Sequence, residues 1–110
     1  MSNPQFAAVL CTVPDENTAT RIARALVEGG LAACCNVVPG LRSVYMWKGE
    51  VCDDAELLLI IKTRLDRFGE LEAAVRDLHP YDVPELIALP VARGSADYLT
   101  WMADHVHPAQ

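Results

Sequence analysis

Two residues with metal-binding side chains, Cys11 and His79, lie far apart in this sequence. A thiolate and an imidazole suit copper, and also zinc, so the pair is a candidate metal site. The same residue types act as nucleophile and base in thiol enzymes, but such catalysis also needs an orienting group and an oxyanion site, which the sequence does not establish. Cys11 lies in an apolar segment, where a thiol commonly packs instead of binding metal. Cys11 and His79 therefore stay candidate metal ligands, with packing of the thiol as the alternative, and we predict that the protein is not an enzyme.

His79 begins a segment, residues 79–91, in which a histidine, a tyrosine and a carboxylate lie close together. Pro80 and Pro84 restrict the backbone there, so the segment is a stiff loop. Stiff loops that carry polar side chains are common binding sites. The alternative is that the prolines only end a helix and begin the strand that follows.

Two further histidines, His105 and His107, alternate near the C-terminus and would point to one side of an extended chain. Two imidazoles make an incomplete metal site, so we favour a solvated pair. The adjacent thiols of Cys34 and Cys35 would point to opposite faces of a strand and would not chelate one ion together.

The bulk composition excludes several classes of protein. The 110 residues predict one domain, 1–110, with 52% hydrophobic residues and a net charge of −6. Only nine Lys and Arg residues are spread along the chain, so we expect no nucleic acid as partner. No apolar run reaches about 18 residues, and residues 1–5 do not resemble a signal peptide. We therefore expect no membrane span, a cytoplasmic location and reduced cysteines.

Apolar periodicity predicts the elements that must position these side chains. Residues 6–13 form a nearly continuous apolar run, typical of a buried strand. Asp15 can cap the helix that follows, and Gly29-Gly30 ends it. The remaining expected elements are a strand over residues 31–47 bent at Pro39-Gly40, a hairpin turn at Lys48-Gly49, a strand over 55–63, a helix ending at Leu78, a strand over 85–91 and a short helix after Ser95 with Tyr98, Leu99 and Met102 on its apolar side.

The order β-α-β-β-α-β-α predicts an α+β fold of the ferredoxin-like, split βαβ type. Right-handed crossovers place the first two helices on the same face of one antiparallel sheet. The strand over 55–63 is nevertheless apolar on both faces. The last helix is too short to cover the second face, so we expect another copy of the chain to cover it.

Six short motifs along the chain form a set that resembles one known family. The motifs are Cys11-Thr12-Val13-Pro14-Asp15; Leu31-Ala32-Ala33-Cys34; Tyr45 with Trp47 and Gly49; Lys62-Thr63; His79-Pro80-Tyr81 with Pro84-Glu85; and Asp97-Tyr98-Leu99 with Trp101. They are spread over about 90% of the chain, in the order found in the CutA family of divalent-cation tolerance proteins, which the sequence resembles.

The resemblance implies a cytoplasmic homotrimer of PII-like plan that binds copper or another divalent metal and contributes to metal tolerance. It also implies Cys11 and His79 as the copper ligands. Some members carry two consecutive histidines at this place, whereas Leu78 precedes His79 here. The alternative is a PII-like signalling trimer that binds a small-molecule effector in a cleft between subunits.

For a ligand site between subunits, the candidate residues are Trp47, Lys62, Tyr81 and Glu85. Lys62 would bring a positive charge to the end of an apolar strand, and Glu85 would hold a cation or pair with that lysine. The alternative is that Lys62 and Glu85 form a structural ion pair across strands while the aromatic rings pack in the trimer interface.

Overall fold

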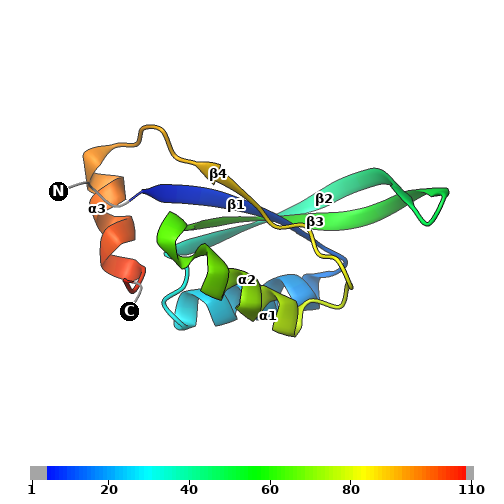
Figure 1. Cartoon of the computed structure of the whole chain (residues 1–110), viewed down its shortest axis with the longest axis horizontal. Coiled ribbons are helices and arrows are strands. Elements are labelled where there is room, and N and C mark those ends of the chain that lie inside the picture. The colour runs from blue at the N-terminus through cyan, green and yellow to red at the C-terminus, as the bar shows by residue number, and fades with distance from the viewer. Residues whose placement is uncertain (1–4, 109–110) are drawn as a thin grey trace.

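The computed structural model describes residues 5–108, which form four strands and three α-helices (Figure 1). In chain order these are β1 (Phe6–Val13), α1 (Glu16–Glu28), β2 (Cys34–Trp47), β3 (Glu50–Arg64), the 3-10 turn η1 (Leu65–Arg67), α2 (Phe68–Leu78), β4 (Ile87–Pro90) and α3 (Ala96–His105). The strands pair antiparallel in the order β2-β3-β1-β4. This topology confirms the predicted α+β, ferredoxin-like split βαβ fold.

The β2–β3 hairpin is longer than the body of the sheet. Its turn places Lys48 and Gly49 at φ 51° and 83°, which is the left-handed pair that a tight hairpin requires. The predicted bend at Pro39-Gly40 is a register shift between Val38 and Leu41. The β3 strand begins at Glu50, earlier than expected, but β1 pairs only with its residues from Leu57 onward. The outer part of the hairpin therefore projects beyond the sheet (Figure 1).

The two longer helices cover one face of the sheet and close the main core (Figure 1). The Asp15 carboxylate accepts a 2.8 Å hydrogen bond from the Thr18 N–H, so the predicted helix cap is confirmed. Side chains that point to this face have almost no exposed surface: Val9, Cys11, Val13, Ile22, Leu26, Leu59, Ile61, Leu71 and Val75. Burying a side chain of this size stabilises the fold by about 1.5–3 kcal/mol each.

The opposite face of the sheet is not covered by any helix among the described residues. Helix α3 instead packs at one end of the sheet (Figure 1). There Met102 and Val106 cluster with Phe6 and Ala33. Tyr98 is 42% exposed, so the prediction that it lies on the packed side of α3 was wrong. Strand alternation places the following residues on the uncovered face: Ala8, Leu10, Val38, Leu58, Ile60, Ile87 and Leu89.

Residues 107–108, the last that the structure describes, form a strap that joins the end of α3 to the loop after α1 and to the 3-10 turn η1. His107 donates its N–H to the Gly30 carbonyl at 2.9 Å, and the buried Arg67 guanidinium donates to the carbonyls of His107 and Pro108. His105 instead ends α3, and its ring contacts the Trp101 carbonyl at 2.8 Å. The expectation that His105 and His107 share one side of an extended chain was therefore wrong.

Candidate functional site

The loop after α2 places His79 and Tyr81 side by side, next to the end of β1. His79 is the C-cap of α2, where its N–H donates to the Val75 carbonyl at 2.8 Å. Its ring contacts the Thr12 carbonyl at the end of β1 through Nε2, at 2.8 Å. The Tyr81 ring packs against the imidazole with centroids 4.7 Å apart. The His79 ring thus joins this loop to the end of β1.

Tyr81 reaches across to a buried carboxylate on β3. Its hydroxyl donates to Glu56 at 2.7 Å, and Glu56 is only 6% exposed. Tyr45 makes the same kind of contact with Asp54, at 2.5 Å. The Asp54 hydrogen bond and charge, with burial, raise the pKa of Tyr45 to about 12. Burial and the Glu56 carboxylate raise the pKa of Tyr81 as well, so both phenols stay protonated donors.

Glu56, Asp54 and Tyr45 were not predicted as site residues. The available signal was a carboxylate, Glu56, directly before the apolar run of residues 57–61, because such a residue is rarely buried without a donor. Sequence spacing alone does not identify Tyr81 as that donor, since 25 positions separate the two residues. Each of the two carboxylates thus accepts a hydrogen bond from a tyrosine hydroxyl.

Cys11 and His79 do not form a ready metal site. The Cys11 side chain has no exposed surface, and burial, together with the nearby carboxylates of Glu85 and Glu56 and the thiol of Cys35, raises the pKa of its thiol to about 12. Metal binding needs the thiolate, so burial opposes it. Both ring nitrogens of His79 already contact the backbone, Nε2 at Thr12 and Nδ1 at Tyr81. No group of three or more metal-binding side chains occurs within residues 5–108.

The four residues expected to bind a small molecule do not meet within one chain. Lys62 donates to the Asn36 side chain on β2, and no ion pair with Glu85 is present among the described residues. Tyr81 contacts Glu56, which lies six residues from Lys62 on β3. About 20 Å of extended strand therefore separates Lys62 from the residue that Tyr81 contacts. Trp47 lies at the tip of the projecting hairpin. Within the described residues of one chain the ion pair of the alternative is therefore not formed, and the ligand site itself stays a prediction that requires a second subunit.

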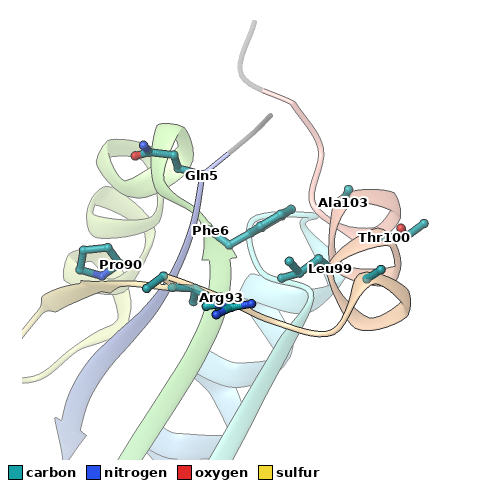
Figure 2. A pocket seen from close by; sticks show the side chains of 10 residues that line it. Gln5, Phe6, Pro90, Arg93, Leu99, Thr100 and Ala103 are labelled. Carbon is teal, nitrogen blue, oxygen red and sulfur yellow. The ribbon is translucent and has the colours of Figure 1, made fainter. Parts of the chain in front are cut away.

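A groove of about 700 Å³ lies at the other end of the sheet, between β1, the end of β4 and α3 (Figure 2). Its lining is mainly apolar, with Phe6, Val91 and Leu99, and with Arg93 as its charged residue. No His, Cys, Asp or Glu is among the lining residues, so the groove offers no metal ligands. Phe6 and Thr12 are six residues apart along β1, which places the groove about 20 Å from the His79 loop.

The sheet order, the two helices on one face and the additional C-terminal helix define a ferredoxin-like α+β protein with an uncovered apolar face. Residues 7–105 match the family described as CutA1 divalent ion tolerance protein, and the chain belongs to this family. The divalent-cation tolerance protein CutA of Thermus thermophilus is 55% identical over 97 residues, which are 88% of this chain and 94% of that protein.

Solved structures agree with this assignment. CutA1 from Oryza sativa superposes with a TM-score of 0.94 at 43% identity, covering 96% of this chain and 97% of that one. A CutA described as periplasmic, from Archaeoglobus fulgidus, has a TM-score of 0.90 at 34% identity over 93% of this chain and 99% of that one. Within residues 5–108, no helix has the length and apolar character that crossing a membrane requires.

Proposed function

We propose that this chain is a cytoplasmic, homotrimeric CutA-type protein that binds divalent metal and contributes to divalent-cation tolerance. Copper is the metal that we expect it to bind. The observation that carries the proposal is the match to the tolerance family over nearly the whole chain. The four cysteines are free, as a reducing compartment would keep them. A tolerance role requires cation binding and no chemical step, so we expect no catalysis.

Exposed apolar surface supports the trimer. Ile87 and Leu89 on the uncovered sheet face are 50% and 46% exposed, and Met46 and Val51 on the projecting hairpin are 63% and 70% exposed. Soluble monomers rarely leave patches of this kind in water, because each buried Å² of apolar surface gains about 25 cal/mol. A threefold arrangement that buries the sheet face and the hairpin would satisfy both surfaces.

Light scattering in dilute solution tests the trimer. We expect about three times the chain mass of 12.0 kDa. Ile87→Asp would place a charge in the uncovered face and should shift the mass towards that of the monomer. Val27→Asp is the matched control, because Val27 is 43% exposed on α1, away from that face, and should leave the mass unchanged. A monomeric parent protein would contradict the proposal.

Calorimetric titration with Cu²⁺ tests metal binding. We expect a weak binding isotherm for the parent protein, because no preformed three-ligand cluster exists within residues 5–108. Comparison with the Cys11→Ala/His79→Ala double variant tests the ligands that the family resemblance implies. Equal affinity in both proteins would exclude these two residues as ligands. Absence of any binding by the parent would refute the metal-binding function.

A further inference from the structure

The hydrogen bonds of His79 determine which of its ring nitrogens carries the proton. A backbone carbonyl only accepts, so the contact with the Thr12 carbonyl requires a proton on Nε2. A backbone N–H only donates, so the 3.2 Å contact from the Tyr81 N–H requires a lone pair on Nδ1. Only the neutral Nε2–H tautomer satisfies both contacts. The ring is held in place because His79 is just 7% exposed.

This arrangement replaces a sheet contact that is missing at the end of β1. Pairing between β1 and β4 stops at Leu10 and Ile87, so no β4 residue pairs with Thr12. The imidazole supplies a donor there and, through Nδ1, also fixes the backbone of Tyr81. The position of that backbone decides whether the Tyr81 hydroxyl reaches the buried Glu56 carboxylate, 2.7 Å away.

We infer that His79 is a positioning residue that latches the loop to β1 and sets Tyr81 against Glu56, and that it is not a metal ligand in the folded protein. A metal needs the lone pair of an imidazole nitrogen. At Nδ1 the metal must displace the Tyr81 N–H, and at Nε2 it must remove the proton and break the contact with Thr12. The neighbouring Cys11 thiol, fully buried, offers no compensating second ligand. The inference stands apart from the proposed metal binding, which can use other groups.

Nitrogen NMR of the ¹⁵N-histidine-labelled protein tests the latch directly. Long-range proton–nitrogen correlations should show Nε2 protonated and Nδ1 as an acceptor for His79. Addition of Zn²⁺, a diamagnetic probe, should leave both His79 nitrogen shifts unchanged. An Nδ1–H tautomer, or a zinc-dependent shift of either His79 nitrogen into the metal-bound range, would overturn the inference. A protein that binds no Zn²⁺ or Cu²⁺ but shows the Nε2–H tautomer refutes only the proposed metal binding.

Three variants separate positioning from ligation. His79→Asn keeps a side-chain oxygen that accepts the Tyr81 N–H two residues later, an Asx-type turn, whereas His79→Ala keeps neither contact. His79→Gln keeps a long donor that reaches towards the Thr12 carbonyl. We expect exchange of the Tyr81 amide to accelerate about tenfold in His79→Ala and to be largely restored in His79→Asn. Equal exchange in the Ala and Asn variants, with loss of Cu²⁺ affinity in all three, would assign His79 to the metal instead.

Discussion

Replacing Gly30 by alanine tests the C-terminal strap that holds α3. Gly30 has φ 73°, and a Cβ atom built there would lie 2.4–2.6 Å from three atoms of the His107 ring, one of which is Cγ, the ring atom bonded to the His107 Cβ. Rotation about χ2 leaves the Cγ atom in place, so we expect the strap backbone to shift away from the new Cβ atom. The left-handed conformation costs alanine about 1–2 kcal/mol.

Moving the strap adds a second cost. Loss of the hydrogen bond from His107 to Gly30 costs about 1 kcal/mol. Weakening of the bonds from the buried Arg67 to two strap carbonyls costs about 1.5 kcal/mol more, because the donor is charged. We expect Gly30→Ala to lower the free energy of unfolding by about 3–5 kcal/mol in total, measured by urea denaturation at fixed protein concentration.

Gly49→Ala is the matched control. Gly49 has φ 83° and no atom within 4 Å of its hypothetical Cβ, so it carries only the conformational cost of about 1–2 kcal/mol. Removing the ring with His107→Ala should recover about 1–2 kcal/mol in the Gly30→Ala background, as a double-mutant cycle measures. The reasoning is refuted if Gly30→Ala and Gly49→Ala destabilise equally, or if the cycle shows no coupling.

Three further perturbations have expected outcomes. Tyr81→Phe should destabilise the protein by about 1.5–3 kcal/mol, since the buried Glu56 loses its hydrogen-bond donor. Tyr45→Phe should cost less because its partner Asp54 is exposed. Equal losses of stability in thermal unfolding would contradict this expectation. The free energy of unfolding should fall as pH rises from 9 towards 12, by up to about 1.4 kcal/mol per pH unit for Cys11. The reason is that the Cys11 thiol ionises first in the unfolded chain, because its pKa in the folded protein is about 12. A Cys11→Ala variant with an undiminished decline would contradict this expectation. Iodoacetamide at pH 8.5 should modify Cys34 and Cys52 well before the buried Cys11, as mass spectrometry of digests would show; Cys11 reacting first would refute its burial.

Local patterns in the sequence were sufficient to predict the fold. Alternating and helical apolar spacing report which face of an element is buried, and β1, α1 and the Lys48-Gly49 turn were found where the pattern placed them. The predicted strand over residues 85–91 is shorter in the structure, Ile87–Pro90. The residues before this strand belong to the loop that contains His79 and Pro84. The periodicity of apolar residues does not predict the contacts of such a loop.

The sequence by itself determined the order of elements, the cap at Asp15 and the excess of apolar sheet surface. Only the tertiary structure decided that α3 lies at the end of the sheet, that Glu56 receives the Tyr81 hydroxyl, and that both nitrogens of His79 are occupied. The physical reason is that spacing along the chain fixes directions within one element. The partner of a polar atom, by contrast, depends on how elements far apart in the chain are packed. The residue type alone therefore does not tell whether the lone pair of a histidine is free or already accepts a hydrogen bond.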